Sequence, residues 1–164
     1  MTNKPELSKT CCFTGHRPER LKAPEKKVIE WLEEQIDKAI ADGYTDFISG
    51  TQRGVDIWAA EIVLKKKREG KNVRLICAVP WAGVEREWEQ NWKERYYQMM
   101  NNADERHFIC NYPGRNAFFE RNHWMVDHSS LLIAAYTGAP GGTKETIDYA
   151  EEKGLEVRAM PKKL

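Results

Sequence analysis

Short apolar segments alternate along this chain with longer segments whose apolar residues recur at helical spacing. The first pattern is typical of buried strands and the second of amphipathic helices. Strands are expected at residues 10–14, 46–49, 73–79, 107–110, 131–136 and 155–160, the last a weak edge strand. Helices are expected from Pro24 to just before Gly43, from Val55 to just before Gly70, from Glu85 through Met99, over 118–126, and from about Thr143 to just before Gly154.

Strict alternation of strands and helices implies parallel pairing through right-handed crossovers. The expected fold class is therefore α/β: a doubly wound, mainly parallel sheet of the Rossmann-like three-layer α/β/α type. Residues 73–79 are almost entirely apolar, as is typical of a central strand covered on both faces. We expect residues 1–164 to form one domain, because 164 residues with 41% hydrophobic content suit a single core and no linker or repeat interrupts them.

The balance of charged residues excludes a strong electrostatic field around the whole chain. Lys and Arg total 26 against 25 Asp and Glu, which gives a formal net charge of +1 and disfavours nucleic acid as a partner. The basic run at 65–68 is interpreted as a solvated helix end, where cations oppose the negative end of the helix dipole. Residues 1–9 lack the apolar core of a secretory signal, and no apolar stretch approaches membrane-spanning length, so we expect a cytoplasmic protein without membrane association. A homo-oligomer is compatible with the sequence.

Glycine-rich loops follow several of the expected strands, at 14–17, 49–54 and 137–143. In open α/β sheets the ligand crevice lies outside the carboxyl ends of the strands. Glycines let backbone amides approach a phosphate, and a helix that starts in such a loop adds the positive end of its dipole. An ordinary strand-to-helix turn explains any one loop. Several on one rim predict a site for a nucleotide or an NAD-derived ligand.

Individual side chains of these loops suit such a ligand. Arg17 and Arg53 can each contact a phosphate bidentately, and Trp81 can stack on a base or nicotinamide ring. Asp56 can accept hydrogen bonds from ribose hydroxyls or can simply cap a helix. The ligand-binding residues expected are Thr14, Gly15, His16, Arg17, Ser49, Gly50, Thr51, Arg53, Gly54, Asp56, Trp81, Arg121, Asn122, Gly138, Gly141, Gly142 and Thr143.

Catalytic motifs give little further support. The loops match neither GxxxxGK[ST] nor GxGxxG, and the histidines lack HExxH or comparable ligand spacing, so no metal site is expected. The four cysteines lie in apolar runs without a CxxC pair, which disfavours a thiol nucleophile. Glu120 and Asp56 are the candidate catalytic carboxylates. Glu120 belongs to a polar triplet, 120–122, for which a surface salt bridge is an equally fair interpretation.

Four segments resemble the YpsA-like branch of the SLOG superfamily: CCFTGHRP, ISGTQRGVDIWAAE, ERNHWMVDHSSLLIAAY and GAPGGTKETIDYA. The resemblance implies a Rossmann-like domain that binds nucleotides, NAD or ADP-ribose derivatives, related to the DNA-uptake protein DprA and the LOG phosphoribohydrolases. The positions that match the superfamily's ligand-binding rim are Gly15, Arg17, Ser49, Gly50, Gly54, Asp56, Gly141, Gly142 and Thr143.

One departure from the LOG pattern bears on activity. LOG enzymes carry PGGxGTxxE, whose glutamate is implicated in N-glycosidic cleavage, whereas this chain has PGGT directly followed by KET. The position of that glutamate falls on Thr146, and Glu145 can substitute only if the helix starts in another register. The resemblance therefore favours binding over hydrolysis.

Three functions are weighed from these observations. The leading one is a sensor or regulatory protein that binds a nucleotide or an ADP-ribose-like ligand, with NAD or ADP-ribose as the candidate small molecule. The alternative is a nucleotide N-glycosidase or phosphoribohydrolase using Glu120, Asp56 or Glu145. Single-stranded DNA binding through the aromatic residues and the 65–68 run ranks last, because the net charge is close to zero.

Overall fold

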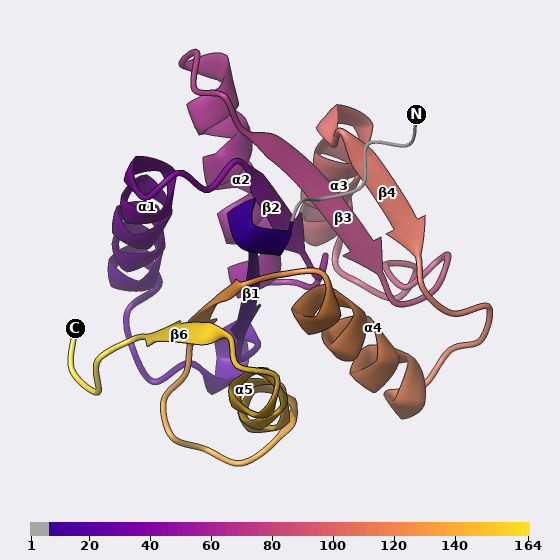
Figure 1. The fold of residues 1–164 in the computed structure, drawn as a ribbon. Coiled ribbons are helices and arrows are strands. Elements are labelled where there is room, and N and C mark those ends of the chain that lie inside the picture. Colours follow the sequence, from indigo (N-terminus) through magenta and orange to yellow (C-terminus); the bar gives the residue numbers. More distant parts are fainter. Residues whose placement is uncertain (1–6) are drawn as a thin grey trace.

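Six parallel strands form one sheet in the order β4-β3-β2-β1-β5-β6 (Figure 1). The structure is a computed structural model that describes residues 7–164, so most of the polar start lies outside the described residues. The strands are β1 Thr10–Gly15, β2 Asp46–Ser49, β3 Arg74–Val79, β4 Glu105–Phe108, β5 Leu131–Ala135 and β6 Glu156–Ala159. The helices are α1 Glu25–Ala41, α2 Val55–Arg68, α3 Gln90–Asn102, α4 Arg115–Asp127 and α5 Gly142–Glu152, with short 3-10 turns η1 Leu7–Lys9 and η2 Pro18–Arg20.

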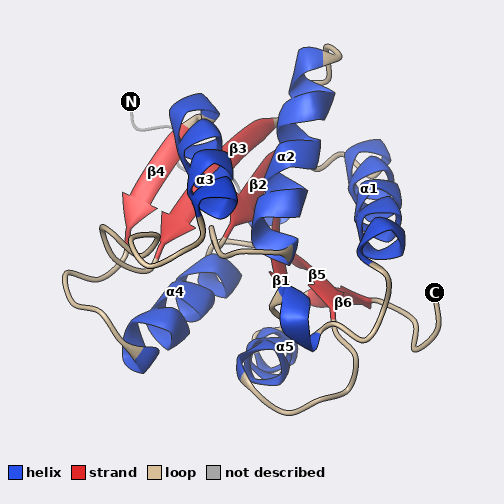
Figure 2. Ribbon diagram, turned by 180° about the vertical axis from the view of Figure 1, so that it is seen from behind, coloured by secondary structure: helices blue, strands red, loops and turns tan. Residues whose placement is uncertain are grey.

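Helices cover both faces of this sheet, which confirms the doubly wound α/β expectation. Helices α1, α2 and α3 pack on one face and α4 and α5 on the other (Figures 1 and 2). Adjacent cysteines show the alternation of a strand, because Cys11 packs in the first layer and Cys12 in the second. Among residues 7–164, no helix combines the length and apolar character that a membrane crossing needs.

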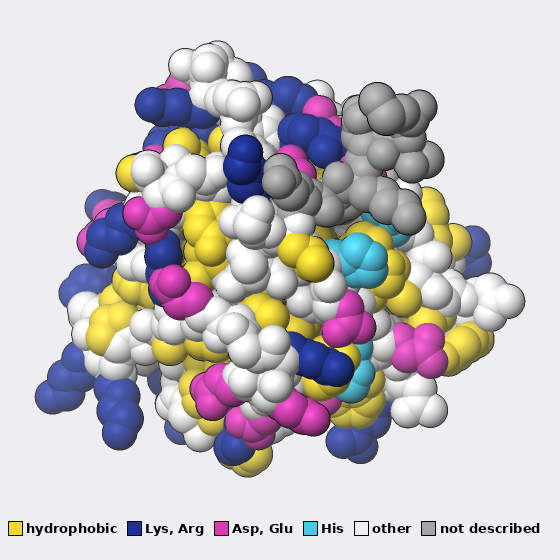
Figure 3. All heavy atoms as spheres, in the orientation of Figure 1, with side chains coloured by type: hydrophobic (Ala, Val, Ile, Leu, Met, Phe, Trp, Pro, Cys, Tyr) yellow, Lys and Arg dark blue, Asp and Glu magenta, His cyan; other side chains and the backbone are white. Residues whose placement is uncertain are grey.

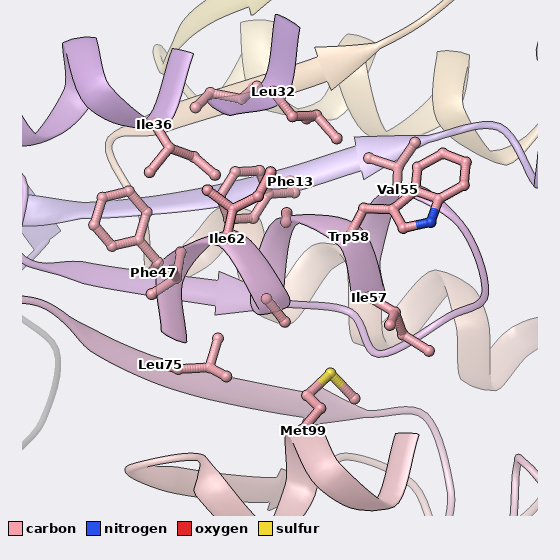
Figure 4. Packing of buried hydrophobic residues seen from close by; sticks show 14 of the residues in the cluster. Phe13, Leu32, Ile36, Phe47, Val55, Ile57, Trp58, Ile62, Leu75 and Met99 are labelled. Atoms are coloured by element: carbon pink, nitrogen blue, oxygen red, sulfur yellow. The ribbon is translucent and has the colours of Figure 1, made fainter. Parts of the chain in front are cut away.

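The larger core layer lies between the sheet and α1–α3 (Figure 4). Phe13 of β1 and Phe47 of β2 stack with ring centroids 6.2 Å apart, and Leu32 of α1 and Trp58 of α2 are buried beside them. Trp92, Tyr96 and Met99 of α3 are also buried. The periodic apolar residues of the helices therefore serve packing, as their spacing predicts.

Strand order reverses at β1. The chain proceeds from β1 to β2, β3 and β4 on one side and then returns to place β5 on the other side of β1, with Gly15 opposite Ala135. The loops after β1 and β5 consequently separate at this point, which leaves room for a crevice at the carboxyl end of the sheet.

Three element boundaries differ from expectation. Helix α3 begins at Gln90 rather than Glu85, because Glu89 has extended backbone angles and the preceding residues form turns such as Trp88 N–H to Glu85 O, 3.0 Å. Strand β4 spans 105–108 rather than 107–110. It is an edge strand whose side chains alternate in exposure, so the apolar run that was used to locate it did not coincide with the strand. Helix α4 starts at Arg115, earlier than the expected 118, after Gly114 with φ +124°.

The interpretation of the basic run 65–68 is wrong at one position. Lys65, Lys67 and Arg68 are exposed, but Lys66 is buried. Its ammonium lies 2.8 Å from Glu33 Oε2 and 2.9 Å from Asp37 Oδ1. These bonds join α2 to α1, and helical spacing alone could not reveal carboxylates on a neighbouring helix.

Gly15 provides a test of how closely β1 meets α2. A Cβ at this position would lie 2.5 Å from Cγ2 and 2.8 Å from Cβ of Val55 in the first turn of α2. Gly15→Ala should lower the free energy of unfolding in urea by about 1–3 kcal/mol, because overpacking forces the two elements apart. Adding Val55→Ala should recover part of that loss.

Gly142 supplies a matched control, since a Cβ there meets nothing within 4 Å. Gly142→Ala should change stability by less than about 0.5 kcal/mol. Equal effects of the two alanine substitutions, or strictly additive effects of Gly15→Ala and Val55→Ala, would show that the close approach is not real.

Candidate functional site

A cleft of about 300 Å³ opens at the carboxyl ends of the strands, beside the reversal at β1. The end of β1, η2, the loop before α2, one side of α4 and the start of α5 form its walls. The lining residues are Phe13, Thr14, Gly15, His16, Arg17, Arg20, Gln52, Arg53, Asp56, Arg115, Phe118, Phe119, Arg121, Asn122, Met125, Gly142 and Thr143.

Positive charge dominates the cleft. Its described lining contains the five arginines Arg17, Arg20, Arg53, Arg115 and Arg121 against one carboxylate, Asp56. Guanidinium groups stay charged at all physiological pH values and match the geometry of phosphate or carboxylate oxygens. Since the chain as a whole carries only +1, this concentration of arginine is local. The cleft is therefore complementary to an anion.

Arg121 and Asp56 form a buried charged unit in the cleft wall. Arg121, 5% exposed, donates from Nη1 to the Gly50 carbonyl oxygen and from Nε to Asn122 Oδ1 at 2.8 Å. Asp56, 8% exposed, accepts from the Gln52 N–H at 3.1 Å. Burial raises the pKa of Asp56, while the positive charge of Arg121 acts in the opposite direction.

The requirement for glycine at position 50 follows from this unit. A Cβ on Gly50 would lie 2.8 Å from Asp56 Oδ2 and 3.0 Å from Arg121 Nη1. Ser49 accepts from the Thr51 N–H at 3.1 Å and donates to the Asp56 carbonyl oxygen at 2.8 Å. Ser49, Gly50 and Thr51 thus shape the loop from behind and do not line the cleft.

Two side-chain nitrogens at the cleft are buried without a hydrogen-bond partner: His16 Nε2 and Gln52 Nε2. His16 is 4% exposed, and its ring lies 5.5 Å from that of Tyr136. Burial lowers the pKa of His16, and the charge of Arg20 adds to the effect. Buried polar groups normally have hydrogen-bond partners, so these two nitrogens are donors or acceptors that the described residues leave unused at the cleft.

The start of α5 forms the remaining wall. Gly141 precedes the helix with φ +137°, and Gly142 and Thr143 line the cleft. Arg20 Nη2 donates to the Pro140 carbonyl oxygen at 3.2 Å, which ties η2 to the loop before α5. Two helix N-termini, those of α2 and α5, therefore border the same cleft and add partial positive charge.

The structure brings together many of the residues expected from sequence. Ten line the cleft: Thr14, Gly15, His16, Arg17, Arg53, Asp56, Arg121, Asn122, Gly142 and Thr143. Seven further residues expected to bind ligand do not line it: Ser49, Gly50, Thr51, Gly54, Trp81, Gly138 and Gly141. Gly54, at φ +89°, is instead a packing position, since a Cβ there would lie 2.8 Å from Pro18 Cδ.

The candidate carboxylates are separated. Only Asp56 lines the cleft, whereas Glu120 lines a second hollow with Trp81. Glu145 is held 2.6 Å from His123 Nε2, and the His123 ring stacks on Tyr149 at 3.8 Å. Within residues 7–164 no group of three or more His, Cys, Asp or Glu side chains gathers as a metal site would require.

Sequence reasoning missed the lining residues Phe13, Arg20, Gln52, Arg115, Phe118, Phe119 and Met125. Gln52 lies inside the glycine-rich loop at 49–54, so its position in the sequence could have identified it as a lining residue. Arg115, Phe118 and Phe119 belong to the first turns of α4, and the expected start of that helix at residue 118 left Arg115 outside it.

The depressed pKa of His16 predicts a pH dependence of stability. The unfolded chain protonates this residue near the ordinary value of 6.5, whereas the folded chain does so only at lower pH. The contribution of neutral His16 to the free energy of unfolding is therefore fully present above 6.5 and is lost as pH falls from 6.5 toward the folded-state pKa. Urea unfolding of the wild type should lose more stability than His16→Gln between about pH 7.5 and about pH 5.5. Parallel pH profiles of the two proteins would contradict this.

Comparisons with known proteins agree with this architecture. A family model described as the YspA SLOG family matches residues 11–160. A UPF0398 protein of Bacillus cereus (strain ATCC 14579) is 26% identical, with 89% of this chain and 84% of the relative covered.

Two solved structures share the fold. DNA processing protein A (DprA) of Streptococcus pneumoniae superposes with a TM-score of 0.60 and 20% identity, covering 94% of this chain but only 50% of that protein. DprA of Helicobacter pylori gives a TM-score of 0.66 and 19% identity, covering 96% of this chain and 66% of its own. This chain thus spans about half the length of the pneumococcal protein. Because the family model extends over nearly all of the described residues, the chain belongs to the YspA SLOG family, the YpsA-like branch of the SLOG superfamily.

Proposed function

We propose that the arginine-lined cleft binds the phosphate groups of a nucleotide or of an NAD-derived ligand such as ADP-ribose, and that the protein acts as a sensor or regulator. One observation carries the proposal: His16 Nε2 and Gln52 Nε2 are buried at this cleft without a partner. A bound ligand would satisfy nitrogens that the folded chain leaves unpaired.

The chemistry of the walls favours phosphate over a neutral ligand. Arg17 and Arg115 are exposed and have no carboxylate partner among the described residues, which leaves their guanidinium groups able to bind an anion. The N-termini of α2 and α5 contribute further positive potential. A volume of about 300 Å³ suits the phosphate and sugar part of a nucleotide, so a dinucleotide or ADP-ribose would extend beyond the cleft.

Binding without hydrolysis is the better proposal because of where the carboxylates lie. Asp56 is the one carboxylate among the described lining residues, and it is buried beside Arg121 as part of the loop structure. Glu120 and Glu145 make their own hydrogen bonds outside the cleft. N-glycosidic cleavage would have to depend on Asp56 alone. Release of base by the wild type that is lost in Asp56→Asn would support cleavage.

Single-stranded DNA is the other candidate ligand, and the experiment below distinguishes it from a nucleotide. The H. pylori neighbour is described by its single-stranded DNA binding mode. In this chain Lys65 and Lys66 contact Glu33, and Lys67 contacts Asp104, so that run is largely neutralised. Acidic and basic side chains are interspersed over the face seen in Figure 3. DNA phosphates would have to use the arginine cleft itself.

Thermal unfolding with AMP, ADP-ribose and NAD tests the proposal. A ligand at 100 times its dissociation constant should stabilise the fold by about 2.7 kcal/mol, or roughly 5–10 °C in Tm. Arg53→Ala should weaken the affinity about tenfold or more through loss of a charged contact. Arg68→Ala removes the same charge from the far end of α2, outside the cleft, and should leave the affinity unchanged.

The result that would overturn the proposal is equal affinity in both arginine variants, or no shift with any of the three ligands at millimolar concentration. A short oligonucleotide that shifts Tm strongly at low salt, while the mononucleotides do not, would instead favour DNA binding.

A further inference from the structure

A second hollow lies beside the cleft at the same edge of the sheet. The loops after β3 and β4 form it, and the backbone hydrogen bond from Cys110 N–H to the Pro80 carbonyl oxygen, 3.0 Å, holds the two loops together. Its lining residues are Trp81, Ala82, Phe108, Ile109, Cys110, Asn111, Tyr112, Pro113 and Glu120.

The lining of this hollow differs sharply from that of the arginine cleft. Among residues 7–164 its lining contains no lysine or arginine, and its charged member is a carboxylate, Glu120. Phe108 is 52% exposed and Tyr112 is 40% exposed, although both are large apolar side chains. Exposed aromatic groups around a hollow are typical of a ligand-binding surface. The surface suits a planar, uncharged group that donates hydrogen bonds.

Glu120 is held as an acceptor. Its Oε2 accepts from the Cys110 thiol at 2.9 Å and its Oε1 from the Tyr112 hydroxyl at 2.6 Å. These two bonds hold the pKa of Glu120 below its ordinary value, so the group is a carboxylate at neutral pH. A carboxylate offers about four lone-pair positions, which leaves room for further donors from a ligand.

The hollow and the cleft adjoin. Glu120 and Arg121 are consecutive residues of α4, and the first lines the hollow while the second lines the cleft. Trp81 of the hollow contacts Phe118 of the cleft edge-on, with ring centroids 5.0 Å apart. The aromatic pair and two consecutive residues of α4 therefore form the boundary between the arginine-lined surface and the aromatic surface.

We propose that this hollow receives the nucleobase of the ligand whose phosphates lie in the arginine cleft, and that Glu120 selects bases carrying an exocyclic amino group. Trp81 and Tyr112 supply surfaces against which the base can stack. The Glu120 carboxylate accepts a hydrogen bond from the amino group. This inference rests on the proposed function, and it assigns Glu120 to recognition instead of acid/base chemistry.

Three ligands that differ only at the base test the assignment: AMP, IMP and ribose 5-phosphate, titrated calorimetrically. AMP carries an amino group at C6, whereas IMP carries an oxo group there and a proton on N1, and ribose 5-phosphate lacks the base. The wild type should bind AMP roughly tenfold more tightly than either of the others, as expected for a hydrogen bond to a charged acceptor. Glu120→Ala should abolish the preference for AMP over IMP and leave the affinity for ribose 5-phosphate unchanged.

Glu87→Ala is the matched control, because Glu87 is an exposed carboxylate in the loop after β3 that lines neither hollow nor cleft. It should keep the full preference for AMP. Equal binding of AMP and IMP by the wild type, or a preference that survives Glu120→Ala, would overturn the base site while the phosphate cleft stands. If none of the three ligands binds, the base site fails, and the phosphate cleft is then judged by the Tm shift with ADP-ribose or NAD.

Discussion

The contact between the Arg121 guanidinium and the Gly50 carbonyl oxygen joins the two layers of the molecule at the edge where a ligand would bind. Arg121 belongs to α4 on one face of the sheet, and Gly50 to the loop that begins α2 on the other face. Arg121 can cross at this point only because Gly50 has no side chain. The wall of the cleft thus depends on a charged group that is buried in place of a packed apolar one.

A buried arginine is costly unless its charge and donors are satisfied. Gly50, in the loop before α2, and the charge of Asp56, in the first turn of α2, meet that need together with Asn122 of α4 itself. In the same lining, the side-chain nitrogens His16 Nε2 and Gln52 Nε2 are buried without a hydrogen-bond partner. The cleft therefore combines an internally neutralised back wall with lining groups that have no hydrogen-bond partner among the described residues, which is the arrangement expected of a preformed binding site.

The sequence predicted the order and type of the elements because strand and helix periodicities are local. It located most of the cleft from the rule that ligands bind at the carboxyl ends of parallel strands. It could not separate Asp56 from Glu120, since both were candidate carboxylates for the same crevice and only the packing of α4 places them in different hollows. Lys66 shows the same limit: its partners Glu33 and Asp37 lie on another helix.

Near-zero net charge and a basic cleft are compatible because many acidic residues pair with lysines and arginines elsewhere, whereas at the cleft Asp56 and Glu19, 3.3 Å from Arg53, face five arginines. Glu33, Asp37, Glu61 and Asp104 contact lysines or arginines of α2 and α3, away from the carboxyl edge of the sheet. These ion pairs on α2 and α3 remove the long-range electrostatic attraction for polyanions. They leave the short-range field of the cleft arginines intact. A small, multiply charged ligand would sense that field only inside the cleft. This distribution of charge is an argument for the proposed anionic ligand, because the described lining of the cleft contains five arginines against one carboxylate.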